Sequence, residues 1–196
     1  MGYDLLAGIG FAILTPLVVV GFVIFWIVTA KDREEHASFF EAYARSRGLD
    51  FEPAKGEWPN RTSVAITWTN EAGAEMRLSV LGREARAKTR LMVRPKQTLF
   101  GELLAAPDPE TYAKLLLRER PKGLGDRVLD ARVRRAILGF CQRDRVVVAY
   151  RRGRFFLEWP GRELNDARLD AARIVGDALA VAIEEAFAAT GARRAA

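Results

Sequence analysis

The residue types that carry most enzyme and metal chemistry are scarce in this chain. Cys141 and His36 are the only cysteine and the only histidine among 196 residues. A single thiol forms no internal disulfide, and one histidine with one cysteine supplies no zinc-ligand spacing, no histidine general base and no Cys–His nucleophile pair. The sequence contains neither GxxxxGKS/T nor GxGxxG, so it predicts no phosphate-binding loop. It therefore predicts no catalytic residue, no metal, no cofactor and no enzymatic activity.

Arginine is the abundant residue that could bind a ligand, because its planar guanidinium matches phosphate and carboxylate groups. Basic residues gather in three sets, which are a predicted hairpin tip (Arg151, Arg152, Arg154), a helical stretch (Arg132, Arg134, Arg135) and one face of predicted strands (Arg77, Lys88, Arg90, Arg94). The hairpin and strand sets are candidate contacts for anionic lipid or another phosphate-bearing ligand. The alternative is a solvated surface that reflects an arginine-rich composition. Nucleic acid is disfavoured, because strand alternation accounts for Tyr150, Phe155 and Phe156 as core rather than as stacking platforms.

The N-terminal region predicts a membrane anchor. Residues 5–30 contain no charged side chain, and about 20 apolar helical residues cross a bilayer core. A cleaved signal peptide is the alternative, but no Lys or Arg precedes the apolar run, and the run exceeds the length of a signal-peptide core. Gly8 and Ala12 form a small-xxx-small pair that could let two membrane helices approach.

The distribution of basic residues predicts the orientation of the anchor. Every Lys and Arg lies after residue 30, beginning with Lys31 and Arg33. Positive charge favours the cytoplasmic side of a span, so the N-terminus is expected outside and the C-terminal domain in the cytoplasm of a bacterium, at its inner membrane. The expected organisation is a transmembrane anchor over 1–30 and a soluble domain over 31–196, with 31–48 as a juxtamembrane helix that either continues the span or turns along the surface.

The soluble domain is expected to be α+β, with a mainly antiparallel sheet packed by helices and a long C-terminal helix. Alternation of apolar and polar residues predicts strands over 49–52, 63–69, 75–80, 87–94, 127–133, 146–150 and 154–159. Helices are predicted over 109–120, 134–142 and from 165 or 166 to 190, the last with a buried stripe of Leu169, Ala172, Val175, Leu179, Ile183 and Phe187. Residues 95–109 are predicted as a loop whose apolar pairs, Leu99-Phe100 and Leu103-Leu104, form a short helix or dip toward the membrane. Cys141 is expected in the core, and His36 on a solvent-facing turn.

The layout resembles uncharacterised bacterial single-pass membrane proteins with a cytoplasmic domain of unknown function. The resemblance rests on one membrane helix, a juxtamembrane helix ending in Arg-Ser-Arg-Gly-Leu, the segment Gly-Asp-Arg-Val-Leu-Asp-Ala-Arg-Val, and a Val-rich hairpin before the last helix. It implies no activity and no site residues. The function expected from the residues is that of a binding or scaffold protein, an accessory subunit of an inner-membrane assembly with a protein partner. The alternatives are a peripheral sensor of anionic lipid or another phosphate-bearing ligand, and an enzyme of unrecognised type.

Overall fold

The computed structural model describes residues 2–55, 63–82, 86–141 and 145–195, with side chains between residues 15 and 190 of those ranges. The chain divides into two compact units, Met1–Ser38 and Phe39–Ala196, and each is described by itself.

The first unit is formed by the helix α1 (Gly2–Arg47), whose last nine residues belong to the second unit. The apolar side chains from Leu17 to Val20 and from Phe22 to Val28 are 48–66% exposed, as expected of a helix that is not part of a protein core. In the part of the chain that the structure describes, α1 is the one helix long and apolar enough to cross a membrane. The helix continues through residues 31–47, so the segment predicted as a juxtamembrane helix is helical. His36 is only 4% exposed, and the prediction of a solvent-facing turn is therefore wrong.

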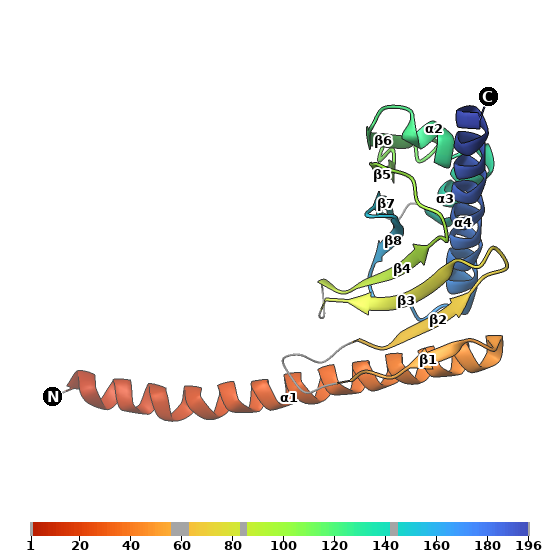
Figure 1. Ribbon diagram of the computed structural model, residues 1–196. Helices are drawn as coiled ribbons and strands as arrows, with labels where there is room; N and C mark the ends of the chain where they lie inside the picture. The colour runs from red at the N-terminus through yellow and green to blue at the C-terminus, as the bar shows by residue number, and fades with distance from the viewer. Residues whose placement is uncertain (1, 56–62, 83–85, 142–144, 196) are drawn as a thin grey trace. The chain divides into compact units, whose positions relative to one another are not determined.

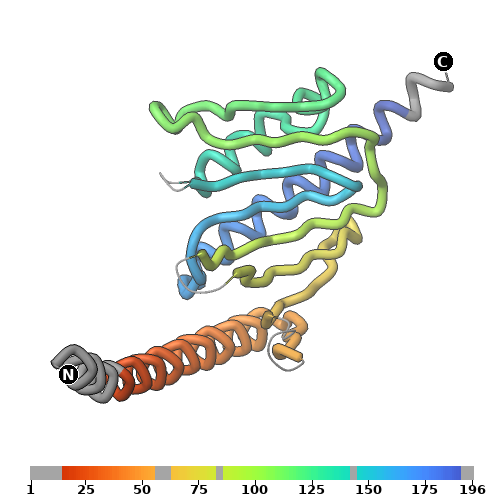
Figure 2. The backbone as a smooth tube through the Cα atoms, turned by 90° about the vertical axis from the view of Figure 1, so that its left-hand side faces the viewer, coloured from red at the N-terminus to blue at the C-terminus, as the bar shows by residue number. Residues whose placement is uncertain are grey.

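The second unit is built on an eight-stranded sheet in the order β1-β2-β3-β4-β8-β7-β5-β6, and neighbouring strands are antiparallel throughout (Figures 1 and 2). The strands are β1 (Asp50–Glu52), β2 (Ala65–Thr69), β3 (Glu75–Leu81), β4 (Lys88–Arg94), β5 (Glu102–Pro107), β6 (Leu115–Arg120), β7 (Val147–Arg151) and β8 (Arg154–Pro160). With its helices, this sheet confirms the predicted α+β class.

One face of the sheet carries the helices α2 (Leu124–Val128), α3 (Ala131–Cys141) and α4 (Asp166–Ala195), which Figure 2 shows behind the strands. Alternate residues of each strand point toward these helices, so Leu91, Leu157 and Val148 are fully buried. The intervening residues, such as Met92 and Phe156, point to the other side. We call that side the open face, because no described segment of the domain covers it.

The C-terminal helix was predicted almost completely. Leu169, Val175, Leu179 and Ile183 are at most 1% exposed, as the stripe requires. Phe187 is 40% exposed, so the buried stripe ends one helical turn earlier than predicted. Cys141 is fully buried at the end of α3, in agreement with its expected place in the core.

Three predicted elements between residues 95 and 133 are wrong. Residues 102–107 form β5 rather than a loop, and the helix predicted over 109–120 is absent, since residues 109–114 form turns and bends and residues 115–120 form β6. Residues 124–128 and 131–141 form α2 and α3, where a strand was expected over 127–133. The physical reason is tertiary pairing. Leu, Arg and Glu favour a helix locally, but pairing β6 with β5 turns Leu115 and Leu117 toward the core.

Candidate anion-binding site

The hairpin of β7 and β8 positions the first set of arginines. Arg151 and Arg154 are paired across the two strands, so Arg152 and Gly153 are the only two residues of the turn. Both have positive φ, 51° and 73°, which defines the type I′ turn that matches the twist of a two-stranded hairpin. The turn therefore brings three guanidinium-bearing residues within four positions at one end of the sheet.

The connection between β4 and β5 holds this hairpin in place. The Leu99 N–H donates to the Tyr150 hydroxyl over 2.9 Å, and that hydroxyl donates to the Leu99 carbonyl oxygen over 2.8 Å. Gly153 lies so close to Thr98 that a Cβ at this position would fall 2.6 Å from the Thr98 Cγ2 atom. The base and the turn of the hairpin are thus fixed, although the arginine side chains themselves are exposed.

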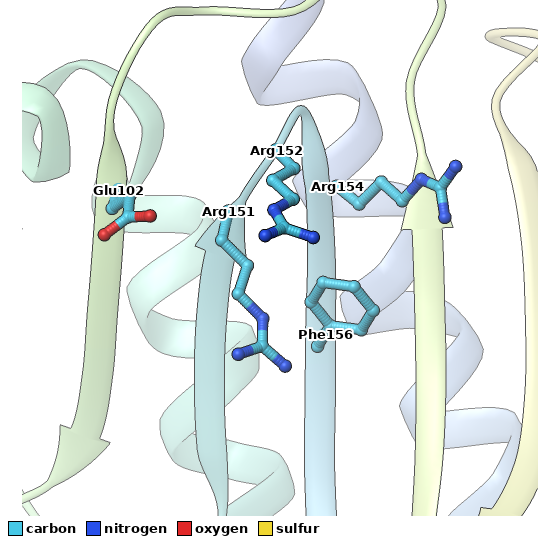
Figure 3. Close-up of a pocket in the computed structure, with 5 residues that line it drawn as sticks. All are labelled: Glu102, Arg151, Arg152, Arg154 and Phe156. Carbon is cyan, nitrogen blue, oxygen red and sulfur yellow. The ribbon is translucent and has the colours of Figure 1, made fainter.

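A hollow of about 560 Å³ lies beside the hairpin, lined by Glu102, Arg151, Arg152, Arg154 and Phe156 (Figure 3). The Arg151 guanidinium sits 5.1 Å from the centre of the Phe156 ring, and this cation–π contact orients it over the open face. Within the described ranges, no carboxylate forms an ion pair with any of the three arginines. Glu102, from β5, is the one acidic residue that lines the hollow. The site is therefore an open, positively charged hollow with an aromatic wall.

The arginines and lysine of the strand set lie on the same open face, but each has an acidic partner. Arg77 pairs with Glu52 over 2.6 Å, and Arg94 pairs with Glu75 over 3.1 Å. Both Arg90 and Lys88 pair with Glu158, the lysine over 3.4 Å. Burial acts to raise the pKa of Glu158, but the hydrogen bond and charge of Arg90, with Lys88, hold that pKa below its usual value. In this half of the face, four cationic side chains share three carboxylates, so most of the positive charge is neutralised.

Two residues of the helical set, Arg132 and Arg134, are also paired with neighbouring acidic residues. Arg134 donates to the Asp126 carboxylate and to the Leu129 carbonyl oxygen, each over 2.6 Å. Arg132 lies 3.3 Å from Glu185. The three sequence sets thus differ in their surroundings, and only the hairpin set combines exposure with a hollow.

Sequence reasoning missed part of the open face. The cross-strand register places Arg118, Leu104, Ala149, Phe156 and Met92 in one row over β6, β5, β7, β8 and β4. Leu104 is 41% exposed in this row, and Phe156 faces the open side rather than the predicted core. Alternation in Leu-Leu-Leu-Arg-Glu-Arg was the available signal for β6, but the same letters also suit a helix.

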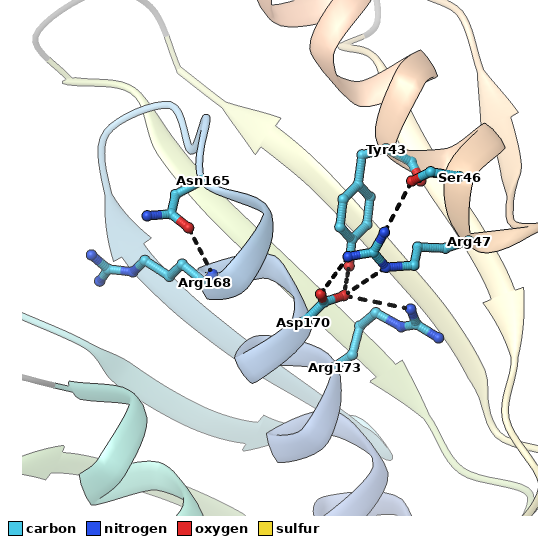
Figure 4. Close-up of polar contacts among 7 residues, drawn as sticks. All are labelled: Tyr43, Ser46, Arg47, Asn165, Arg168, Asp170 and Arg173. Carbon is cyan, nitrogen blue, oxygen red and sulfur yellow. Dashed lines mark hydrogen bonds and ion pairs between the residues drawn. The ribbon is translucent and has the colours of Figure 1, made fainter.

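A second polar cluster, on the helical side of the domain, joins α1 to α4 (Figure 4). The Tyr43 hydroxyl donates to Asp170 over 2.8 Å, and Arg47 donates to both oxygens of that carboxylate over 3.2 and 2.6 Å. These contacts, the hydrogen bond from Arg47 above all, lower the pKa of Asp170. Nearby, the side chain of Asn165 accepts the Arg168 N–H over 3.2 Å and caps the start of α4. Tyr43, Arg47 and Asp170 are bonded to one another inside the domain, so we assign this cluster a structural role.

No group of three or more His, Cys, Asp or Glu side chains within the described residues is placed to hold a metal ion. Gly8 and Ala12 lie on α1, but their side chains are outside the described residues, and the predicted helix packing stays a prediction.

Comparison with known proteins finds a similar fold but gives no information on the site. No family model matches the chain, and no curated protein matches it. The chain is similar to the crystal structure of the mycobacterial trehalose monomycolate transport factor A, TtfA, with a TM-score of 0.52 and 13% sequence identity. The similarity covers 74% of this chain and 94% of that one. At this identity the likeness shows a shared fold alone.

Proposed function

We propose that this protein is a membrane-anchored binding protein, an accessory subunit of a bacterial inner-membrane assembly, and that it docks an acidic region of a partner protein on its open face. The observation that carries the proposal is the hollow formed by Arg151, Arg152 and Arg154. These residues face solvent with no ion-pair partner among the described residues, while each basic residue of the strand set has an acidic partner.

The chemistry of the hollow favours binding over catalysis. Guanidinium groups hold their protons at physiological pH and offer only donors, so they bind anions and do not exchange protons. The exposed apolar Leu104 beside the basic residues gives the open face the mixed character of a protein-docking surface rather than that of a small-ion site. The neighbour in the structural comparison is named as a transport factor, which is compatible with an accessory role.

The anchor supports a membrane location, and the excess of Lys and Arg after residue 30 supports a cytoplasmic domain. In the proposed arrangement, residues 5–30 cross the membrane and α1 continues out of it toward the binding domain.

Binding of a fluorescent hexaglutamate peptide to the full chain in lipid nanodiscs tests the proposal. Changing Arg151, Arg152 and Arg154 to Gln should remove the binding seen at low ionic strength. A control variant removes the same net charge from exposed arginines elsewhere, by changing Arg127, Arg135 and Arg145 to Gln. This variant should keep most of the binding. Equal losses in both variants would show that only net charge matters, and the assigned site would be wrong.

Anionic lipid is a second candidate ligand, favoured by Phe100. Its side chain is 93% exposed, in the segment whose Thr98 contacts the hairpin turn. Arginines next to an exposed aromatic suit a membrane interface. Amide exchange of the full chain in nanodiscs of phosphatidylglycerol or phosphatidylcholine distinguishes the candidates. Protection of residues 97–101 and 150–154 that appears only in phosphatidylglycerol, and is lost in Phe100→Ser, would favour the lipid.

A further inference from the structure

β6 is the outermost strand on its side of the sheet, and its outer edge is open. It pairs with β5 over six consecutive residues without a bulge, and no other described strand pairs with it. Proteins usually protect such edges by short strands, charged side chains, prolines or bulges. The opposite edge follows that rule, because β1 has only three residues. β6 is instead a regular six-residue strand that begins with three leucines, and the charges of its Arg-Glu-Arg end are the one such protection it carries.

The backbone groups that face outward can be assigned from one hydrogen bond. The Asp108 N–H donates to the Lys114 carbonyl oxygen over 2.9 Å, so the polar backbone groups of Lys114 point toward the β5 side. In an antiparallel strand this direction alternates along the chain. The N–H and C=O groups of Leu115, Leu117 and Glu119 therefore point away from the sheet, where they are available to another strand.

The side chains beside this edge indicate what kind of strand could pair with it. On the open face, Leu116 is 50% exposed, and Arg118 and Arg120 are exposed with no ion-pair partner among the described residues. On the helical face, Glu119 is already occupied, because its carboxylate accepts the Gly123 and Gly125 N–H groups over 2.6 and 2.5 Å. The open side of the edge thus offers one apolar and two cationic positions, and it continues through Glu102 toward the hairpin hollow.

A second copy of the chain fits this edge poorly. Antiparallel self-pairing centred on Leu117 places Arg120 of one copy opposite Lys114 of the other. Centring the pairing on Arg118 places that residue opposite itself. Like charges directly opposite each other destabilise a strand pair. The charges at this edge therefore disfavour pairing with a second copy of β6 and favour pairing with a strand that carries carboxylates.

We propose that β6 accepts an extended acidic segment of a partner protein as a ninth strand, with carboxylates opposite Arg118 and Arg120 and an apolar residue opposite Leu116. This inference rests on the proposed function, since it names how the acidic partner engages the same open face. Backbone hydrogen bonds to Leu115, Leu117 and Glu119 would provide binding, and the two arginines would provide selection.

The test uses the full chain in nanodiscs and three labelled peptides. The probe is acetyl-Glu-Thr-Glu-Val-Val-Ile-amide, which places Glu opposite Arg120 and Arg118 in antiparallel pairing. One control replaces both Glu by Lys, and the other keeps the side chains but methylates the backbone nitrogens that face β6. We expect the probe to bind at least tenfold more tightly than either control. It should also slow amide exchange at Leu115, Leu117 and Glu119.

Variants separate this inference from the proposed function. Arg118→Glu combined with Arg120→Glu should reverse the preference to the Lys peptide, whereas Arg135→Glu on α3 should not. If the triple Gln variant of the hairpin loses hexaglutamate binding while the probe still protects β6, both assignments stand as separate contacts. Binding that survives backbone methylation, or leaves the β6 amides unprotected, would overturn strand addition without touching the hairpin site. If the β6 amides become protected from exchange as protein concentration rises, with no peptide present, the edge pairs with a second copy of the chain and the proposed peptide binding is wrong.

Discussion

Replacing Arg152 by Asn should stabilise the domain while weakening its anion binding. Arg152 is the first turn residue of the β7–β8 hairpin and has a φ of 51°, a conformation that a side chain with a Cβ rarely adopts. Asn followed by Gly is the preferred pair for this turn type, because Asn tolerates the left-handed region. The natural residue at this position is therefore a poor local choice for the fold.

The size of the effect follows from the backbone. The left-handed conformation costs an ordinary residue roughly 1–2 kcal/mol, and Asn avoids part of that, so we expect a gain of about 1 kcal/mol. The Arg152 side chain is exposed and forms no ion pair with the described residues, so its removal should offset little of the gain. For a domain of this size, the gain should raise Tm by about 2–4 °C.

Thermal unfolding of the full chain in detergent micelles measures this shift. Trp159 is 1% exposed and provides the fluorescence signal. Gly153→Ala is the opposite control and should lower Tm, because its φ is 73° and the added Cβ would meet the Thr98 side chain. Hexaglutamate binding by Arg152→Asn should fall roughly fivefold, from about 1 kcal/mol per arginine near an anionic surface. A variant with unchanged Tm would refute the strain argument, and one with unchanged binding would remove Arg152 from the site.

Two further predictions concern the contact between Arg47 and Asp170 and the orientation of the anchor. Arg47 and Tyr43 donate hydrogen bonds to the Asp170 carboxylate and lower its pKa. The ionised carboxylate therefore stabilises the fold above its unfolded pKa of about 4, and this stabilisation is lost as pH falls through the folded pKa. Denaturant unfolding should show Asp170→Asn to be less stable than the natural chain at pH 7, with a gap that closes below about pH 4; a gap that persists there would show that the charge is irrelevant. Topology reporters fused after Ala196 test the orientation: one active only in the cytoplasm should work, and one active only outside should be silent, whereas the reverse would place the domain outside.

The sequence was sufficient to predict an element where the spacing of apolar residues within that element determined its structure. The uncharged run from Leu5 to Ala30 specifies a helix whatever surrounds it, and that segment is helical. Val64 to Trp68 and Met76 to Val80 alternate between apolar and other residues, and both were predicted as strands, although Ala65 and Ser79 on the second face are buried as well. The β7–β8 hairpin was also predicted, with residues 151–153 as its connection, but in the structure Arg151 pairs with Arg154 and the turn is two residues long.

Prediction failed where pairing between distant segments decided the structure. Residues 115–120 have helix-forming side chains, and only β5 alongside them makes them a strand. The same error hid part of the surface, because Arg118 and Arg120 reach the open face only if they lie on that strand. The sequence also could not say which arginines are balanced. Glu158 neutralises Arg90 from 68 positions away in the chain.

The positions of acidic ion-pair partners bear on whether the basic surface merely reflects the arginine-rich composition of the chain. An arginine-rich composition alone would place guanidinium groups without regard to nearby acidic residues. Along the open face, however, Arg77, Arg90 and Arg94 each have a carboxylate, whereas the hairpin arginines, like Arg118 and Arg120 on β6, have none among the described residues. The hairpin also holds Arg152 in a conformation that Asn or Gly would adopt at lower cost. A group of like charges at a locally unfavourable position is what the proposed anion site would show, and the stability gain expected of Arg152→Asn measures what that position costs the fold.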